Sequence, residues 1–213
     1  TFTTSATTIQ LGGNLNLADS WSSTTTNLSL TADAELSSTS AVEAATLQSN
    51  GFNFKLASVT SDLTLADAFT LASGTISTQG ADLVFAGSAD ISSGATLDAS
   101  VSSGTGGKLE FRQGGTAFGT INARNATFKI GAAYAVPGTL RTNGSIPWDL
   151  ASNLDLSGGT LELGGNVVLD KVLTDNGTKF RLNGEDATVT RNQGFTLGGL
   201  RFDNSTLTLG SAT

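Results

Sequence analysis

The segment DLTLADAFTLASGTISTQGADLVFAGSADISSGATLDASV, which runs from Asp62 to Val101, contains nearly the same strand twice. DLTLA at residues 62–66 returns twenty positions later as DLVFA at residues 82–86. In both copies polar and apolar residues alternate, which is typical of a β-strand with one buried face. A short strand that recurs at this interval predicts a repeating architecture in which equivalent strands stack on one another.

Similar alternating segments occur along most of the chain, at residues 14–19, 27–34, 153–156, 160–164 and 206–210. The pattern predicts an all-β fold, a single-stranded parallel β-helix (β-solenoid) with coils of about 20 residues. We expect it to form a single domain over residues 1–213.

The intervals between equivalent residues make this prediction specific. Leu63 is expected to lie about 5 Å from Leu83, and Leu109 at the same distance from Phe128, because neighbouring strands are spaced in this way. Leu161 and Phe180 are likewise 19 residues apart. The interval from Leu83 to Leu109 is longer and requires a loop that bulges out of its coil.

An antiparallel β-sandwich is the alternative. It is favoured by four dipeptides that are common in hairpin turns, Asn50-Gly51, Asn143-Gly144, Asn176-Gly177 and Asn183-Gly184. The segment KVLTDNGTKFRL at residues 171–182 has the pattern of an antiparallel hairpin. Thr39–Gln48 is the best candidate for a short helix.

Composition limits the chemistry that the chain can perform. The 213 residues include no Cys, His or Met, which excludes disulfides, thiolate nucleophiles, imidazole bases and zinc sites of the usual kind. The abundance of Ser, Thr, Gly and Asn favours an extracellular location. The chain starts at Thr1 rather than Met, which predicts a processed product or an excised piece.

The formal charge of −7 is unevenly distributed. Residues 1–107 hold nine acidic residues and one basic residue, whereas residues 108–213 hold nine acidic and ten basic residues. An acidic half repels phosphates, so we expect no nucleic-acid partner. No segment approaches the roughly 18 apolar residues of a membrane helix, so we expect no membrane insertion.

Acidic residues do not form an obvious catalytic cluster. Polysaccharide hydrolases need convergent carboxylates, but the only adjacent pair, Glu185-Asp186, is expected in a turn. Four aspartates are expected near coil corners, where their side chains would form Asx turns or, as a less favoured alternative, bind calcium: Asp62, Asp82, Asp90 and Asp98. We therefore expect no enzymatic activity, no cofactor and no metal site.

Basic residues form the candidate contact surface for an acidic glycan. They occupy solvent-facing positions of predicted strands and are Lys108, Arg112, Lys129, Lys179 and Arg181. If the strands stack, these side chains form a ladder; the alternative is a charged face that keeps the sheet soluble. Trp21, Trp148 and Tyr134 are the aromatic candidates for stacking on sugars.

Two segments resemble a known group of proteins. LTLADAFTLASGTI at residues 63–76 and NLDLSGGTLELGGNVVLDKV at residues 153–172 are similar to passenger regions of large secreted bacterial adhesins. These include autotransporters and filamentous-haemagglutinin-like proteins. The resemblance implies a right-handed β-helix at the cell surface, and no functional motif transfers residue by residue.

The terminal strands are the candidate assembly sites. Ile9 and Leu11 share one face near the start of the chain, and Leu207 and Leu209 share one face near its end. Neither segment holds a charge or a proline that would protect an exposed strand edge. The sequence thus predicts an extracellular structural or adhesive rod that contacts itself head to tail, or contacts flanking repeats of the same polypeptide, and that also meets cell-surface glycan. The alternatives are a carbohydrate-binding module and a polysaccharide-degrading β-helix enzyme.

Overall fold

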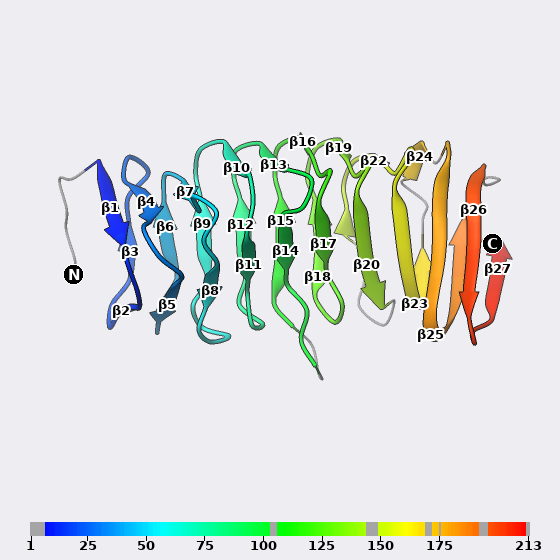
Figure 1. The fold of residues 1–213 in the computed structure, drawn as a ribbon, viewed down its shortest axis with the longest axis horizontal. Helices are drawn as coiled ribbons and strands as arrows, with labels where there is room; N and C mark the ends of the chain where they lie inside the picture. The colour runs from blue at the N-terminus through cyan, green and yellow to red at the C-terminus, as the bar shows by residue number, and fades with distance from the viewer. Residues whose placement is uncertain are drawn as a thin grey trace.

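Strands stack along one axis from the N-terminus to the C-terminus (Figure 1). The computed structural model describes residues 7–102, 106–143, 149–168, 172–174, 176–191 and 196–211. These residues form a β-solenoid of about nine turns and contain no helix. All strand pairs among them are parallel, which confirms the solenoid and shows that the antiparallel sandwich is wrong.

Each turn places strands on three faces, which follow one another along the chain. The first face holds β1 (Thr8–Leu11), β4 (Asn27–Leu30), β7 (Leu47–Gln48), β10 (Phe69–Leu71), β13 (Ala89–Ile91), β16 (Gly115–Thr116), β19 (Tyr134–Ala135), β22 (Leu154–Asp155) and β24 (Val172–Thr174). The second face holds β2 (Leu15–Leu17), β5 (Ala34–Ser38), β8 (Phe54–Leu56), β11 (Thr75–Ser77), β14 (Thr96–Asp98), β17 (Thr120–Asn122) and β20 (Thr139–Asn143). The third face holds β3 (Trp21–Ser22), β6 (Val42–Ala44), β9 (Leu63–Leu65), β12 (Leu83–Phe85), β15 (Lys108–Phe111), β18 (Thr127–Ile130) and β21 (Asp149–Leu150).

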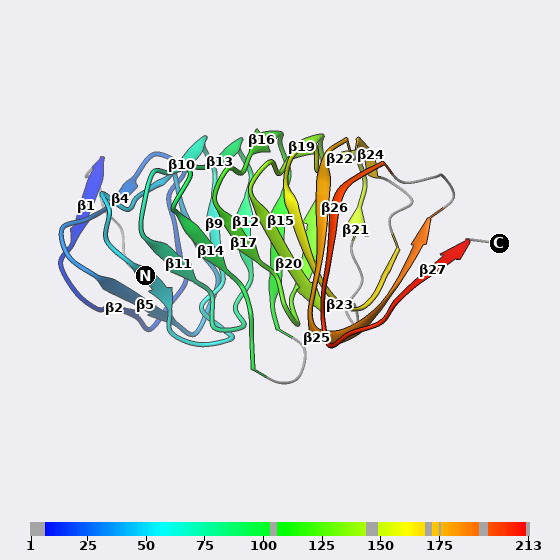
Figure 2. The ribbon, with the colours of Figure 1, turned by 45° about the vertical axis from the view of Figure 1, so that its right-hand side comes forward.

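Longer strands close the C-terminal part of the solenoid. They are β23 (Thr160–Val168), β25 (Thr178–Arg191), β26 (Leu197–Asp203) and β27 (Leu207–Ser211). The first part of β25 pairs with β26 and its second part pairs with β27. In Figure 2, β26 and β27 diverge from a shared corner.

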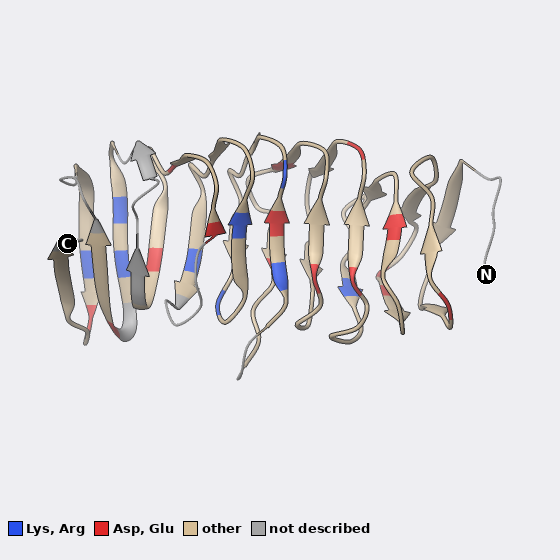
Figure 3. Ribbon diagram, turned by 180° about the vertical axis from the view of Figure 1, so that it is seen from behind, with Lys and Arg blue, Asp and Glu red and all other residues tan. Residues whose placement is uncertain are grey.

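The register agrees with the spacing of the sequence. Leu83 pairs with Leu63, Leu109 pairs with Phe128, and Leu83 also pairs with Leu109 across the longer interval. In Figure 1 the strands of the second face lie at the front and run down the page. Figure 3 shows the molecule from behind, and there the strands of the third face lie at the front and run up the page. The chain therefore winds in a right-handed sense as it advances.

Inward-facing side chains form ladders through the core. Phe69, Phe85 and Phe111 stack with ring centroids 5.0 Å apart at each step. Tyr134 packs 4.4 Å from Phe111 and donates a hydrogen bond to the carbonyl of Ala89. Burial raises the pKa of Tyr134, and nearby Asp90 adds to the effect.

Two of the three aromatic candidates for sugar binding belong to this interior. Trp21 and Tyr134 are buried, so neither presents a ring to a saccharide in solution. Trp148 lies outside the described residues.

The helix expected at Thr39–Gln48 is wrong. This segment forms β6 and β7, which pair with strands of the preceding turn. An isolated helix of ten residues is marginal in water, whereas the strands bury Val42, Ala44 and Leu47 in the core.

The hairpin expected at residues 171–182 is also wrong. β24 pairs in parallel with β22, and β25 pairs in parallel with β23. Asn176-Gly177 lies at the corner between β24 and β25, with Gly177 in the left-handed region at φ 74°. Asn50-Gly51 likewise turns a corner, with both φ values positive. A residue with a positive φ turns the chain at a solenoid corner as well as in a hairpin, so these dipeptides do not specify a hairpin.

The remaining two dipeptides give no hairpin evidence. Asn183-Gly184 lies within β25, where the register against β23 shifts. Glu185-Asp186, expected in a turn, is in the same strand. Gly144 lies outside the described residues.

Aspartates near the corners connect successive turns. Asp62 accepts a hydrogen bond from the backbone N–H of Asp82, whose own carboxylate accepts one from the N–H of Lys108. Asp90 accepts from the N–H of Thr116 in the same way. These three do not form the expected Asx turns, because the N–H groups of the next turn are within reach in the stacked structure.

Asp98 behaves as predicted. Its carboxylate accepts a hydrogen bond at 3.0 Å from the N–H of Ser100, two residues later, which is an Asx turn. It also accepts a hydrogen bond from the side-chain amide of Asn122 in the next turn.

Acidification is expected to weaken the contact at Asp33. The backbone N–H and then the side-chain amide of Asn53 donate to this carboxylate and lower its pKa. A lowered folded-state pKa stabilises the protein above the unfolded Asp pKa of about 3.9, and this contribution is lost as pH falls through the folded value. We expect Asp33→Ala to reduce the difference between urea midpoints at pH 7 and pH 3. An unchanged difference in Asp33→Ala would show that Asp33 makes no pH-dependent contribution.

Candidate assembly surface

The core ladder continues into the last described turn, where its members are exposed. Leu200 is in register with Phe180, and Phe202 is in register with Leu182. Phe180 and Leu182 are buried, whereas Leu200 is 47% exposed and Phe202 is 48% exposed. The inward positions of β26 therefore carry large apolar side chains that no further turn covers among the described residues.

The neighbouring strand adds to this surface. Leu207 and Leu209 of β27 are in register with the buried Ala187 and Val189. Leu209 is 60% exposed, and Leu207 is partly buried against the core. We call Leu200, Phe202, Leu207 and Leu209 the C-terminal apolar end.

The sequence pattern did not identify Leu200 and Phe202 as candidate assembly residues. The available signal was the match of Phe180-Arg181-Leu182 with Leu200-Arg201-Phe202, twenty residues later. It places a core strand at β26, but only the position of β26 in the stack exposes its apolar side chains.

Among the described residues, the opposite end of the solenoid exposes no large apolar side chain. Ile9 is partly buried against the core, and so is Leu15 of β2. Leu11 is buried in the first described turn. Of the two residues expected to make assembly contacts at this end, Ile9 is therefore the more accessible.

Charge differs between the two ends, as Figure 3 shows. On the second face, Asp33, Glu35 and Lys55 line a groove of about 280 Å³ near the N-terminal end, together with Asn14 and Asn53. Near the C-terminal end of the same face, a groove of about 320 Å³ is lined by Thr160, Lys179, Phe180, Arg181, Gly199, Leu200 and Arg201. The lining thus changes from two acidic residues and one basic residue to three basic residues along the rod. Glu35 pairs with Lys55 in the first groove, and Asp203 pairs with Arg181 and Arg201 beside the second.

Three of the five candidate glycan-facing cations gather around one carboxylate on the third face. Glu110 lies 3.2 Å from Lys108, 3.4 Å from Arg112 and 3.9 Å from Lys129. Burial raises the pKa of Glu110, but hydrogen bonds from Lys108 and Arg112 outweigh this effect, and the net pKa is lowered. Lys129 also pairs with Asp149 at 3.0 Å.

The other two candidates lie on the second face. Arg181 pairs with the buried Glu162 at 3.0 Å, and Arg141 approaches the same carboxylate at 2.7 Å. Lys179 is exposed on β25 beside Arg181. The five cations therefore do not form one ladder, because β15 and β18 belong to the third face and β25 to the second.

Removal of the buried carboxylate of Glu162 is expected to destabilise the fold. Glu162→Ala would remove the shared partner of Arg141 and Arg181, while Asp203 stays 3.7 Å from Arg181. We expect a cost of about 2 kcal/mol after allowance for this remaining pair and for the partial exposure of both arginines. Urea denaturation measures the change. Glu35→Ala is the matched control, since Glu35 pairs with Lys55 at the surface and its loss should cost under about 0.5 kcal/mol. Equal losses in both variants would contradict a special role for Glu162.

Neither a cluster of metal-ligating side chains nor a long apolar helix occurs among the described residues. No group of three or more of their acidic side chains is arranged to hold a metal ion. No helix among them is long and apolar enough to cross a membrane.

Asp186 of the predicted acidic pair accepts a hydrogen bond from the N–H of Thr206 at 2.7 Å.

Comparison with known proteins finds no matching family model, no similar curated protein and no similar solved structure. A functional conclusion therefore depends on the geometry of the chain itself.

Proposed function

We propose that this chain is an extracellular structural and adhesive protein, a segment of a surface rod or filament that associates end to end. The observation that supports this proposal is the C-terminal apolar end, where the core ladder continues into exposed side chains. Another copy of the chain, or a flanking repeat of the same polypeptide, would supply the next turn.

Stacking of a further turn would bury apolar side chains and pair strand edges, as stacking does within the solenoid. Covering the exposed parts of Leu200, Phe202 and Leu209 contributes roughly 1 kcal/mol for each side chain. The outer edges of β26 and β27 have no neighbouring strand among the described residues, so their backbone groups are available for pairing. An unpaired edge of this kind recruits another strand.

The distribution of charge favours one orientation. In head-to-tail order, the basic groove with Lys179, Arg181 and Arg201 approaches the acidic groove with Asp33 and Glu35 of the next copy. Head-to-head contact would bring like charges together. A head-to-tail interface does not close on itself, so it produces a filament rather than a dimer.

Sedimentation velocity and negative-stain electron microscopy over a range of concentration test the proposal. We expect particles that grow in length at constant diameter, and that form more slowly at high salt because the end charges are screened. A chain that remains monomeric at millimolar concentration, or that forms only irregular lateral aggregates, would contradict self-association through the ends.

A further inference from the structure

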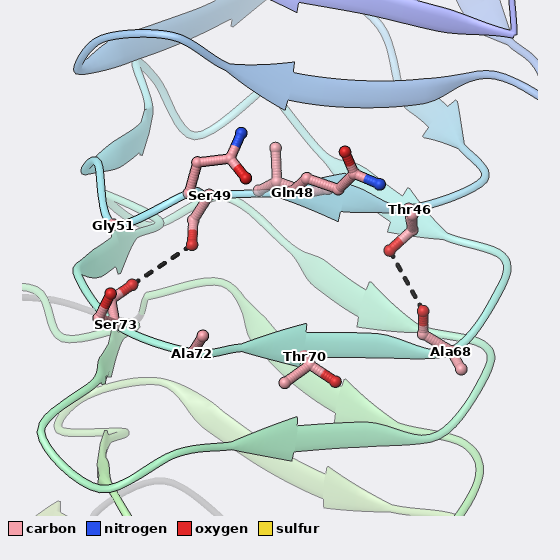
Figure 4. Close-up of a pocket in the computed structure, with 10 residues that line it drawn as sticks. Thr46, Gln48, Ser49, Gly51, Ala68, Thr70, Ala72 and Ser73 are labelled. Carbon is pink, nitrogen blue, oxygen red and sulfur yellow. Dashed lines mark hydrogen bonds between the residues drawn. The ribbon is translucent and has the colours of Figure 1, made fainter.

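One sheet follows the second face through the described turns of the solenoid. β2 forms its edge at the N-terminal end, and β26 and β27 form its edge at the C-terminal end. The first face lacks this continuity, because no strand pairing joins β7 to β10 in the described part of the chain. Figure 4 shows how the hydroxyls of Thr46 and Ser49 bridge this gap to the carbonyls of Ala68 and Ser73. The second-face sheet is therefore the one whose pairing a further copy can continue.

Inward residues of this sheet form a column that keeps its register from the second turn to the last described turn. Each member pairs with the member in the following turn. The members are Ala34, Phe54, Ile76, Leu97, Ile121, Leu140, Leu161, Phe180 and Leu200. Because the pairing does not slip along this column, the column predicts which residue of a further turn would follow Leu200.

The outward residues beside this column carry opposite charges at its two ends. Near the N-terminal end, Glu35 pairs with Lys55 of the following turn at 3.0 Å. Near the C-terminal end, Arg201 is in register with Arg181, and both lie near Asp203, at 3.3 and 3.7 Å. The outward column thus begins with a carboxylate and ends with two adjacent arginines.

The backbone of β26 is oriented to pair with one more strand. Lys179 N–H donates to Gly159 C=O, so the outward residues of β25 bond to the preceding strand and its inward residues bond to β26. The same alternation directs the N–H and C=O groups of Leu200 and Phe202 away from β25. These groups face the end of the solenoid, where no strand follows among the described residues.

The backbone of β2 has the complementary orientation. Ala57 N–H donates to Leu36 C=O, so Leu36 bonds toward β8 and the residues on either side of it bond toward β2. Leu15, which is in register with Leu36, therefore bonds toward β5. Asn14 and Asn16 direct their backbone groups to the other side, where β2 is the edge of the sheet.

We infer that β26 of one copy pairs in parallel with β2 of the next copy, with Arg201 opposite Asn14. In this register Asn14 N–H donates to Leu200 C=O, and Phe202 N–H donates to Asn14 C=O. Asn16 N–H then donates to Phe202 C=O. The inference rests on the proposed end-to-end association and specifies the strands and the register of its joint.

The apolar side chains select this register. It places Phe202 over Leu15, which is only partly buried, and Leu200 over Gly13. A Cβ at Gly13 would meet no atom within 4 Å, so there is space for the Leu200 side chain. A slip of one residue would turn the apolar side chains of β26 outward. A slip of two residues would place Phe202 over Leu17, which is already buried at 7% exposure.

The charges select the same register. Asn14 and Glu35 line one groove and precede paired residues of β2 and β5, so Glu35 follows Asn14 in the outward column. Arg201 and Glu35 of the next copy would therefore lie two strands apart, about 10 Å between Cα atoms, within the combined reach of their side chains. A slip of two residues would replace Glu35 with the uncharged Ser37 in this position.

Disulfide cross-linking measures the register, since the chain contains no Cys of its own. Arg201→Cys is mixed with Asn14→Cys, oxidised, and analysed by non-reducing electrophoresis and by mass spectrometry of the linked peptides. Paired Cα atoms about 4.8 Å apart can be joined by a disulfide, whereas Cα atoms about 8 Å apart, as after a slip of two residues, cannot. Arg201→Cys mixed with Asn16→Cys is the matched control, and we expect about tenfold less cross-linked dimer from it.

Hydrogen exchange of the unmodified protein gives a second measurement that does not depend on a substitution. Assembly should increase the protection of the N–H groups of Asn14, Asn16 and Phe202, and leave that of Arg201 unchanged, because Arg201 N–H already faces β25. Filaments in which these three N–H groups gain no protection would overturn the inference.

The cross-linking outcomes separate the joint from the association itself. Filaments that cross-link Arg201→Cys to Asn16→Cys, or Arg201→Cys to itself, would overturn the inferred register and leave end-to-end association standing. Filaments without a cross-link in either mixture would also overturn the inference alone. Absence of assembly by the unmodified protein would overturn both the inference and the proposed function.

Discussion

Replacement of both Leu200 and Phe202 by aspartate is expected to abolish end-to-end association while each copy remains folded. Both side chains already lie half exposed at the C-terminal apolar end, so the substitutions remove little buried surface within one copy. In an assembled filament, however, they would place two unpaired carboxylates in an apolar interface. A buried charge without a partner costs several kcal/mol, which exceeds the gain from the remaining contacts.

Phe118→Asp is the control for this double variant. Phe118 is 61% exposed, but it lies at a lateral corner between β16 and β17 rather than at an end of the solenoid. We expect sedimentation to show monomers for the double variant and wild-type filaments for Phe118→Asp. Filaments of normal length from the double variant would show that β26 is not part of the joint.

Phe111→Ala is expected to destabilise the protein by about 4 kcal/mol. Phe111 is fully buried and contacts Phe85, Phe128 and Tyr134, with ring centroids 5.0, 5.8 and 4.4 Å away. Phe85, Phe111 and Phe128 come from stacked strands of the third face, and Tyr134 comes from the first face. The backbone on two faces therefore cannot collapse easily into the space left by the substitution. The cost therefore includes both the lost burial and a residual cavity.

Urea denaturation measures the total effect of Phe111→Ala, and hydrogen exchange locates it. Because each turn of a solenoid contacts mainly its neighbours, protection should fall most in β12, β15 and β18 and least in β5. Phe118→Ala, which truncates an exposed ring, should cost under about 0.5 kcal/mol. Similar losses for the two variants would contradict the importance of the aromatic column.

Alternation in the sequence is enough to separate the inside of the solenoid from its outside. Alternation has a period of two, so the polar and apolar sides of each strand can be assigned before the strands are placed. Recurrence at about 20 residues then predicted the pairing of Leu63 with Leu83 and of Leu109 with Phe128. The longer interval before Leu109 was also recognisable as an insertion, because the alternating pattern resumes after it.

The surface that each outward residue occupies depends instead on the folded arrangement of the strands. Lys129 and Lys179 both follow the outward pattern of a strand, yet they lie on the third and second faces. Corner lengths differ from turn to turn, so the number of residues between Lys129 and Lys179 does not reveal that their strands lie on different faces. Asn176-Gly177 shows the same dependence, since its left-handed turn suits a hairpin and a corner equally well.

The exposed surface on which the proposed association rests, and the gap in the first-face ladder, also depended on the stack. Leu200 and Phe180 follow the same inward pattern in the sequence, and only the absence of a further described turn beyond β26 exposes Leu200. Leu47 and Thr70 belong to strands as regular as their neighbours, but the backbones of β7 and β10 are not in pairing contact. Alternation in the sequence indicates the direction of the side chains, whereas backbone hydrogen bonds depend on the distance between strands in the folded chain.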